Sequence, residues 1–345
     1  MSSSPAPSGT LTPGLDALLH SAAFAPIDNT GWIRVTGSDR VRWLNGMVTN
    51  NIAALKPGEG NYNFFLNAQG RIQGDCTAWM QEDSILLETS PSQTNALMAM
   101  LDHFIIMDDV ELIILEDRHG LQIAGPSAFS IVRTLGTGNG AAEPCSVVPT
   151  PSQPDATTPW LLLRQTLYAD ASVDLIRAHT PTVTRFELWS DHVTIAAIVD
   201  ELNTTTAITA VPEDLENLRI LSGTPLYGVD IRDKDLPQET NQTRALHFAK
   251  GCYLGQEIVE RIRSRGAVHR TFTGFVLTGD LPTPGTPLAA DGKPVGELTS
   301  VARIGDRTVA LGYIRREILD RNASIQYSGG AATPSALPFP IASKS

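Results

Sequence analysis

The sequence is poor in cysteine, with only Cys76, Cys145 and Cys252 among 345 residues. Three scattered cysteines are too few for a disulfide framework, so we expect a reducing compartment. No C-x-x-C and no H-E-x-x-H pattern occurs, which argues against zinc sites of those types. Neither a Walker A loop nor a G-x-S-x-G elbow is present, and "GTGNG" (136–140) lacks the strand-to-helix setting of a dinucleotide fingerprint.

Basic residues are also few. The chain has 26 Lys and Arg residues but 37 Asp and Glu residues, which gives a net charge of −11. An acidic chain is a poor general nucleic-acid binder, since neutralising phosphates requires a basic face. No apolar run reaches the roughly 18 residues that a membrane span needs, so we expect no membrane contact. The opening "MSSSPAPSGTLTPG" has no basic or apolar leader segment, which favours a bacterial cytoplasmic protein over a secreted or imported one.

The chain predicts an α+β fold with two α/β units and a C-terminal antiparallel β-barrel. We expect a first domain at 25–117 plus 205–262, a second at 118–204 with a long loop at 136–159, and the barrel at 263–330. The ends, 1–24 and 331–345, are expected to be tails. Strands are predicted at 32–37, 62–80 around a turn, 84–90, 109–117, 160–167 and 185–190, and helices at 39–48, 90–104, 190–203 and 211–223.

The stretch "AKGCYLGQEIVERIRSRG" (249–266) contains the most reactive combination of residues. If "KGCY" is extended, Lys250 and Cys252 share a face, and the ammonium lowers the pKa of the thiol. A helix should follow Gly255, with Glu257 and Arg261 as an i,i+4 pair. Two interpretations of Cys252 stay open, a reactive thiolate or a small buried apolar residue. The arginines of this stretch are either solvated or bind an anion.

The same stretch, read as "KGCYLGQEIVER" (250–261), resembles the signature of the YgfZ family of folate-binding proteins, which are paralogues of the glycine-cleavage T-protein. "RILSGTPLYGVDI" (219–231), "LPQETN" (236–241), "LNGMVTNNI" (44–52), "FLNAQGRIQGD" (65–75) and "MDDVEL" (107–112) are similar to further family blocks. "GELTSVA" and "ALGYIRRE" resemble the family's C-terminal barrel. The resemblance covers about residues 25 to 328.

The resemblance implies a three-domain ring around a central hole that holds tetrahydrofolate. It implies an accessory factor that assembles or repairs iron–sulfur cluster proteins and supports tRNA modification indirectly, through a cluster-dependent tRNA-methylthiolation enzyme. The implied partners are folate and iron–sulfur proteins or their assembly factors, and we expect a monomer. Cys252 is the implied functional residue, as a thiolate or a ligand of a transient iron–sulfur cluster, and Lys250 accompanies it.

A set of folate-binding positions follows from the resemblance rather than from spacing. It comprises position 66, which is Leu66 and precedes Asn67, together with Arg71, Asp75, Tyr227, Asp230, Glu239, Asn241, Tyr253, Gln256, Glu257 and Arg261.

Two positions depart from the T-protein pattern. Gly74 stands where the T-protein has the first of two adjacent carboxylates, and Leu221 stands where its helix carries a pterin-binding Glu. Asp75, Asp230, Glu239 or Glu257 could replace that Glu, because a pterin needs a carboxylate opposite its N–H groups. The alternatives are a folate-dependent aminomethyltransferase or demethylase of the T-protein type, and a scaffold without ligand in which Cys252 is buried.

Overall fold

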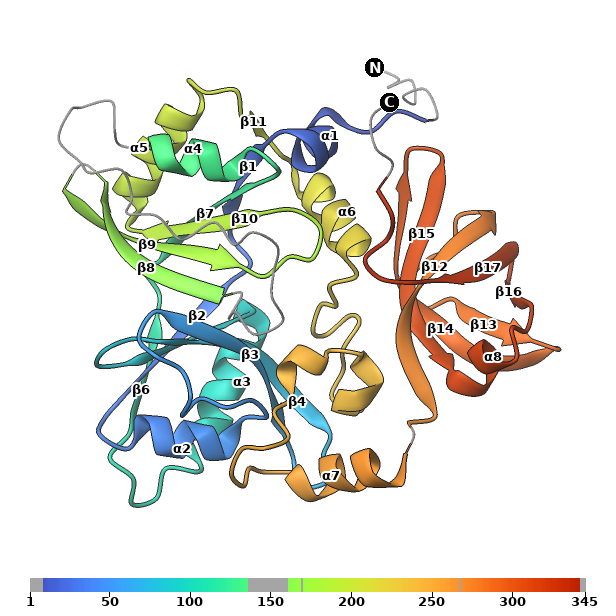
Figure 1. Ribbon diagram of the computed structural model, residues 1–345, viewed down its shortest axis with the longest axis horizontal. Coiled ribbons are helices and arrows are strands. Elements are labelled where there is room, and N and C mark those ends of the chain that lie inside the picture. Colours follow the sequence, from blue (N-terminus) through green and yellow to red (C-terminus); the bar gives the residue numbers. More distant parts are fainter. Residues whose placement is uncertain (1–8, 136–160, 169, 267, 342–345) are drawn as a thin grey trace.

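A computed structural model describes residues 9–135, 161–168, 170–266 and 268–341 (Figure 1). The predicted loop at 136–159 and Cys145 lie outside this range. Three parts surround a central segment that contains helix α6 (Pro212–Ser222), as Figure 1 shows. The expected ring of two α/β units and a barrel is therefore confirmed.

The first unit contains the strands predicted between residues 31 and 117. They are β2 (Gly31–Thr36), β3 (Glu59–Leu66), β4 (Ile72–Met80), β5 (Ile85–Thr89) and β6 (Glu111–Leu115), with helices α2 (Arg40–Met47) and α3 (Pro91–Asp102). Helix α3 packs an apolar face on the sheet, where Leu97 and Leu101 are buried among strand residues such as Ile33 and Leu87. This burial fixes which side of each strand faces the centre of the molecule.

The second unit contains β1 (Ala23–Ile27), β7 (His119–Ala124), β8 (Leu161–Tyr168), β9 (Ala171–Ala178), β10 (Arg185–Ser190) and β11 (Ile208–Thr209), with helices α4 (Ala128–Thr134) and α5 (His192–Leu202). Because β1 pairs with β7 and β11, residues 23–27 belong here and not to the first unit. Asp191 rather than Ser190 caps α5, since its side chain accepts from the backbone N–H of Thr194 at 2.9 Å.

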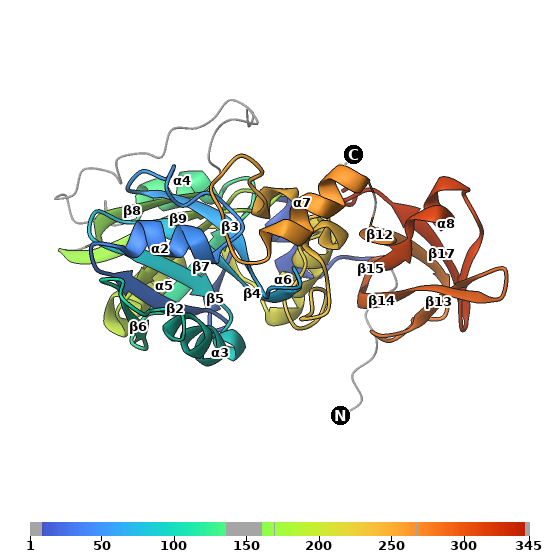
Figure 2. The same ribbon diagram turned by 90° about the horizontal axis from the view of Figure 1, so that it is seen from below.

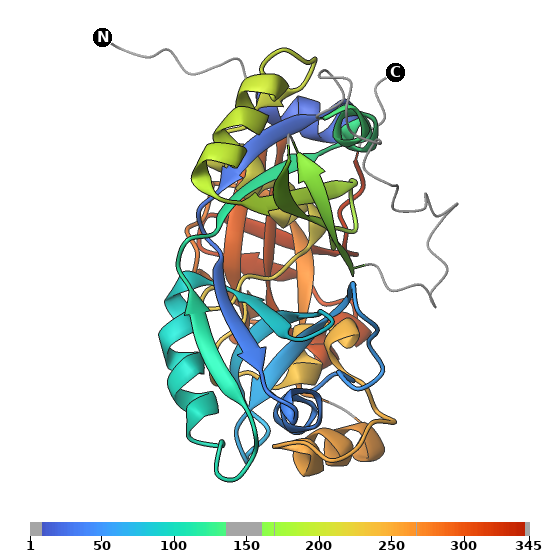
Figure 3. The same ribbon diagram turned by 90° about the vertical axis from the view of Figure 1, so that its left-hand side faces the viewer.

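One continuous sheet of eleven strands joins the two units, in the order β11-β1-β7-β10-β9-β8-β3-β4-β5-β2-β6. The junction is the antiparallel pairing of β3 with β8, at Glu59 opposite Leu162. Figure 3 shows the two halves of this sheet one above the other, with the barrel behind them. Side chains of the two halves can therefore face a common space.

The N-terminal segment is partly ordered, so the prediction of a tail over 1–24 is wrong from residue 13 onward. Helix α1 (Pro13–His20) begins at Thr12, whose hydroxyl accepts from the backbone N–H of Leu15. Leu15 and Leu18 are 1% exposed, and the helix packs against α6. Burial of these leucines supplies the free energy that orders the segment, and the Ser- and Pro-rich start of the chain hid this amphipathic pattern.

The C-terminal part is a closed antiparallel barrel in the order β12-β15-β14-β13-β16-β17. Its strands are β12 (Arg270–Gly279), β13 (Pro287–Ala290), β14 (Lys293–Ile304), β15 (Arg307–Arg315), β16 (Ile325–Tyr327) and β17 (Gly330–Ser335), with helix α8 (Arg316–Asp320). The tail predicted at 331–345 is wrong as far as residue 339, because β17 closes the barrel against β12 and Phe339 is 2% exposed.

The connection from α6 to the barrel runs through two short 3₁₀ helices, η2 (Pro237–Thr240) and η3 (Thr243–Ala245), and then α7 (Gln256–Arg265). Figure 2 shows this connection between the sheet and the barrel. Within the described ranges, no helix has the length and apolar character to cross a membrane.

Candidate functional site

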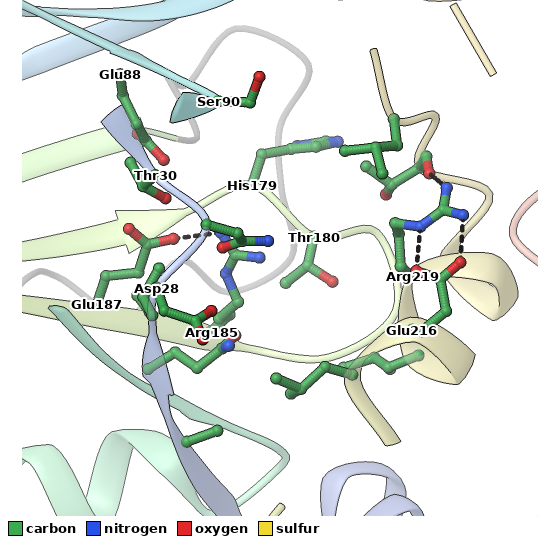
Figure 4. Close-up of a pocket in the computed structure, with 18 of the residues that line it drawn as sticks. Asp28, Thr30, Glu88, Ser90, His179, Thr180, Arg185, Glu187, Glu216 and Arg219 are labelled. Carbon is green, nitrogen blue, oxygen red and sulfur yellow. Dashed lines mark hydrogen bonds and ion pairs between the residues drawn. The ribbon is translucent and has the colours of Figure 1, made fainter. Parts of the chain in front are cut away.

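A cavity of about 600 Å³ lies between the two halves of the sheet and α6 (Figure 4). This volume falls in the range of small-molecule sites. Its walls carry five carboxyl groups against two guanidinium groups. The carboxyl groups are Asp28, Asp75, Glu88, Glu187 and Glu216, and the guanidinium groups are Arg185 and Arg219. Such a wall suits a ligand rich in N–H donors.

Asp75 on β4 is held from both sides. The hydroxyl of Tyr62 donates to Oδ2 at 2.5 Å, and Gln93 Nε2 donates to Oδ1 at 2.8 Å. Gln93 Oε1 in turn accepts from the backbone N–H of Asp75. Burial raises the pKa of Asp75, although these two hydrogen bonds and the charge of Arg244 oppose the rise. The carboxyl group is therefore fixed in one orientation at the cavity wall.

Glu88 on β5 and Glu187 on β10 come from opposite halves of the sheet. Glu187 is 2% exposed and accepts hydrogen bonds from Arg185 and from Trp189 Nε1. Glu88 Oε2 accepts from Trp79 Nε1 at 2.8 Å. Burial, and then the charge of Glu187, raise the pKa of Glu88 to about 8. At neutral pH, Glu88 therefore carries a proton.

Arg219 on α6 lines the cavity but has no donor left for a ligand. Its Nε and Nη2 donate to the two carboxyl oxygens of Glu216 at 2.7 and 2.6 Å. Nη1 donates to the Thr224 carbonyl and to Asp230 Oδ2, both at 2.7 Å, and Nη2 also donates to Ser300 Oγ at 2.8 Å. A guanidinium has five N–H groups and all five are used, so Arg219 ties α6 to the barrel.

His179 also lines the cavity and is neutral. Burial, and then the charges of Arg244 and Arg185, lower the pKa of His179 to about 3. Arg244 lies over the ring of Tyr62, 4.1 Å from its centroid. The acidic excess of the wall is thus balanced by Arg185 and by Arg244 behind Tyr62.

Only two of the predicted folate-binding residues, Asp75 and Tyr227, line this cavity. The prediction that position 66 binds folate is wrong, because Leu66 is 1% exposed within an apolar cluster. Arg71 is exposed and donates to the carbonyl of Lys234. Tyr253 belongs to the same apolar cluster as Leu66. None of these three residues lines the cavity.

Of the acidic residues predicted to replace the T-protein Glu, Asp230 and Glu239 are buried outside the cavity and Glu257 is exposed. Asp230 is fully buried and accepts from Arg219, Thr299 and Ser300. Glu239 accepts from Arg270 and from the backbone N–H of Leu236. Neither residue lines the cavity. Both neutralise arginines at the contact between the connection and the barrel, a structural use of charge.

Helix α7 forms where it was predicted, with the expected pair between Arg261 Nη2 and Glu257 Oε1 at 2.7 Å. Both side chains are exposed, with Glu257 at 83%. Gln256 begins the helix, and Asn241 ends η2 in the left-handed region at φ 57°. None of these four residues lines the cavity, so their predicted contact with folate is not formed there.

Lys250 is a buried anchor and does not face Cys252. Its Nζ donates to the backbone carbonyls of Asn45, Val48 and Asn50 at 2.6, 2.7 and 2.6 Å. Three acceptors match the three N–H groups of an ammonium. Burial lowers the pKa of Lys250 to about 8. The shared face predicted for the two side chains is therefore wrong.

Cys252 is exposed, which excludes the interpretation as a buried apolar residue. Its loop is held against the turn at 67–70, where a Cβ on Gly255 (φ 81°) would lie 2.6 Å from the carbonyl oxygen of Asn67. This glycine allows the close approach that no other residue would. In the described ranges no three His, Cys, Asp or Glu side chains gather as a metal site.

Sequence reasoning missed Glu88 and Glu187, although each left a signal. Each is a single carboxylate inside a strand of large apolar residues, in "ILLET" and "RFELWS". A charge within an apolar strand is costly unless it is paired or functional. That pattern could have marked both residues, but their meeting across the two units could not be read from the sequence.

Comparisons with known proteins agree on the fold. Residues 14–250 match the family described as the GCVT N-terminal domain, and residues 265–338 match the CAF17 C-terminal beta-barrel domain. The solved aminomethyltransferase T of the glycine cleavage system from Bartonella henselae superposes with a TM-score of 0.80 at 20% identity, covering 94% of this chain and 88% of that one.

Two curated relatives carry names that describe a role. The iron–sulfur cluster assembly factor IBA57 homolog of Neurospora crassa, a mitochondrial protein, is 27% identical over 323 residues, with 88% of this chain and 64% of that protein covered. The tRNA-modifying protein YgfZ of Yersinia enterocolitica is 26% identical over 246 residues, with 71% and 68% covered. The chain thus spans about two thirds of the length of these relatives.

Proposed function

The chain belongs to the GCVT N-terminal domain family and carries a CAF17-type barrel, and from that premise we propose that it is a tetrahydrofolate-binding accessory factor for the assembly or repair of iron–sulfur cluster proteins. Support of tRNA modification would follow indirectly, through enzymes that need such clusters. The expected cytoplasmic location and the monomeric state stay predictions, since the name of the Neurospora relative places that protein in mitochondria.

The observation that carries folate binding is the acidic cavity between the two halves of the sheet. A pterin ring presents an amino group and a ring N–H, which need carboxylate acceptors. Asp75 and Glu187 supply fixed acceptors, and Tyr227 adds an aromatic wall. Tetrahydrofolate would therefore bind by its pterin end inside the cavity.

The role in cluster assembly rests on Cys252. An exposed thiol on a loop that Lys250 fixes in place can reach a cluster or a thiol on a second protein. Because a single thiol cannot complete a metal site, the other ligands would come from the client protein. Folate in the cavity and the thiol on the loop would then be separate functional groups of one factor.

A true aminomethyltransferase is the rival function, and the structure of β4 argues against it. A Cβ at Gly74 would lie 2.7 Å from Leu97 Cδ2 and 3.0 Å from Gln93 Oε1. The carboxylate that the T-protein pattern has at this position would therefore require the Leu97 and Gln93 side chains of α3 to move. Leu221, the other departure, is 5% exposed in the apolar core beside α1. Methylene-tetrahydrofolate formed from an aminomethyl donor by the pure protein would revive this rival.

Calorimetric titration with tetrahydrofolate tests the proposed ligand. We expect saturable binding by wild type and a weakening of about tenfold or more in Asp75→Ala, because one charge-assisted hydrogen bond is lost. Arg261→Ala, a change on the exposed face of α7, is the matched control and should bind as wild type does. Absence of binding by wild type at millimolar ligand would refute a folate site.

Complementation tests the role in cluster assembly. In a host that lacks its own relative, wild type should restore the activity of a cluster-dependent enzyme, and Cys252→Ser should not. Comparable protein levels of the two variants are the control, since the exposed thiol contributes little to stability. Full restoration by Cys252→Ser would remove the thiol from the proposal.

A further inference from the structure

Glu88 and Glu187 line the same cavity from different strands, and their hydrogen bonds differ in kind. Figure 4 shows both side chains beside Thr30, with Arg185 reaching Glu187. Glu187 has a guanidinium partner on one oxygen and the N–H of Trp189 on the other. Glu88 has the N–H of Trp79 on Oε2. In the described part of the chain, no cation forms an ion pair with Glu88.

The groups around Glu88 leave it neutral. Burial raises its pKa most and Glu187 on β10 raises it further, while the Trp79 hydrogen bond and the charges of Arg185 and Arg118 oppose the rise. Cys76 on β4, one residue before the strand partner of Glu88, adds no charge here, because burial raises the pKa of its thiol well above the usual value. Since Oε2 accepts from Trp79, Oε1 is the oxygen from which a protonated Glu88 would donate to a ligand.

We propose that Glu88 and Glu187 form a donor–acceptor pair, in which the Glu88 carboxyl donates to a ligand carbonyl and Glu187, held by Arg185 and Trp189, accepts from the ring N–H next to it. The pair recognises a lactam, which is a ring N–H group next to a ring C=O group. Glu88 is then a specificity-determining residue of the cavity. This inference rests on the proposed folate site, because the 4-oxo edge of a pterin is such a lactam.

The pair also excludes a related class of heterocycle. A ring with an amino group in place of the 4-oxo group presents a second donor to the Glu88 hydroxyl. Two donors cannot share a hydrogen bond, so one would be buried without a partner, which is costly. A 4-oxo tetrahydropterin should therefore bind at neutral pH more tightly than its 4-amino counterpart by about tenfold or more.

The test is the pH dependence of tetrahydrofolate binding in wild type and Glu88→Gln. The glutamine amide keeps a donor at every pH. If the neutral carboxyl is required, the Kd of wild type at pH 9 should be about ten times that at pH 7, because about one tenth of Glu88 stays protonated. The Kd of Glu88→Gln should not follow this rise, and titration of the ligand itself is common to both proteins.

The outcomes separate this inference from the proposed function. No binding by wild type at pH 7 would refute the folate site itself. Binding with parallel pH curves for both proteins, or equal affinity for the 4-oxo and 4-amino rings, would overturn only the donor–acceptor pair. If Glu88→Gln fails to fold, NMR of the side-chain carboxyl carbons of wild type decides. The proposal predicts that one glutamate titrates near pH 8. A spectrum in which no glutamate titrates above about pH 6 would contradict it.

Discussion

The central cavity and the Cys252 loop hold their ionisable groups in opposite ways. In the cavity, carboxyl groups from β4, β5 and β10 meet although their strands lie far apart in sequence. In the loop, Lys250 and Cys252 are two residues apart but separate completely, one into three carbonyl groups and the other into solvent. Sequence proximity was thus a poor guide to which groups act together.

The difference is one of burial. A cavity wall can hold a carboxyl group at a shifted pKa only because neighbouring strands exclude water around it, as at Glu88. The loop has no such enclosure, and its only buried charge is satisfied by backbone groups. We therefore expect variants in the loop to divide into large structural effects at Lys250 and small ones at Cys252.

The largest effect is expected for Lys250→Met. The change leaves three backbone carbonyl groups buried without a donor, so the free energy of unfolding should fall by about 3 kcal/mol or more. Urea denaturation measures this loss as a lower transition midpoint with an unchanged m value. Unchanged stability of Lys250→Met would show that the three hydrogen bonds do not anchor the loop.

A smaller loss is expected for Arg219→Lys. An ammonium cannot reproduce the five hydrogen bonds that the guanidinium donates to Glu216, Thr224, Asp230 and Ser300, so about 2 kcal/mol should be lost. The control is Arg261→Ala, whose exposed ion pair should contribute less than about 0.5 kcal/mol. Equal midpoints in chemical denaturation for the two variants would contradict the role of Arg219 as a tie to the barrel.

Glu88→Gln should gain stability relative to wild type as the pH rises. The folded-state pKa of about 8 lies above the ordinary value of 4.5. Between pH 4.5 and pH 8, the native state of wild type therefore holds a proton on Glu88 that the unfolded state has lost. The contribution of Glu88 to the free energy of unfolding is complete below about pH 4.5 and is lost as the pH rises to about 8. Relative to its value below about pH 4.5, the gain of the variant should reach about 3 kcal/mol near pH 7. A constant difference in Tm from pH 5 to 9 would argue against a protonated Glu88.

The smallest change in stability is expected for Cys252→Ser. Since the thiol is exposed, the free energy of unfolding should change by less than about 0.5 kcal/mol, even though the variant should fail in complementation. A loss comparable to that of Lys250→Met would mean that Cys252 is structural, and the contrast between the two residues would disappear.

Much of the fold could be predicted from the sequence. Period-two alternation and turn residues located β2 to β6, and the short strands after residue 270 predicted the barrel. Helix α1 and strand β1 were missed, because the Ser- and Pro-rich start suggested a tail and because β1 is ordered by pairing with the distant β7. Long-range pairing of this kind leaves no local signal.

The site was harder to predict than the fold. The signature around Cys252 indicated the family, but it contributed no residue to the cavity wall. Tyr227 and Asp75 came from the resemblance, while Glu88 and Glu187 required the pairing order of the sheet. Lys250 was misplaced because three backbone carbonyl groups of residues 45–50 accept from its ammonium, and these residues lie about 200 positions away in the sequence.

A crystal structure of the protein with tetrahydrofolate tests the central claim most directly. The account predicts the ring system in the cavity between β5 and β10, with its N–H groups on Asp75 or Glu187 and with Cys252 free in solvent. Ligand density beside Cys252, or a cavity that stays empty under saturating ligand, would contradict the separation of a folate cavity from a thiol loop.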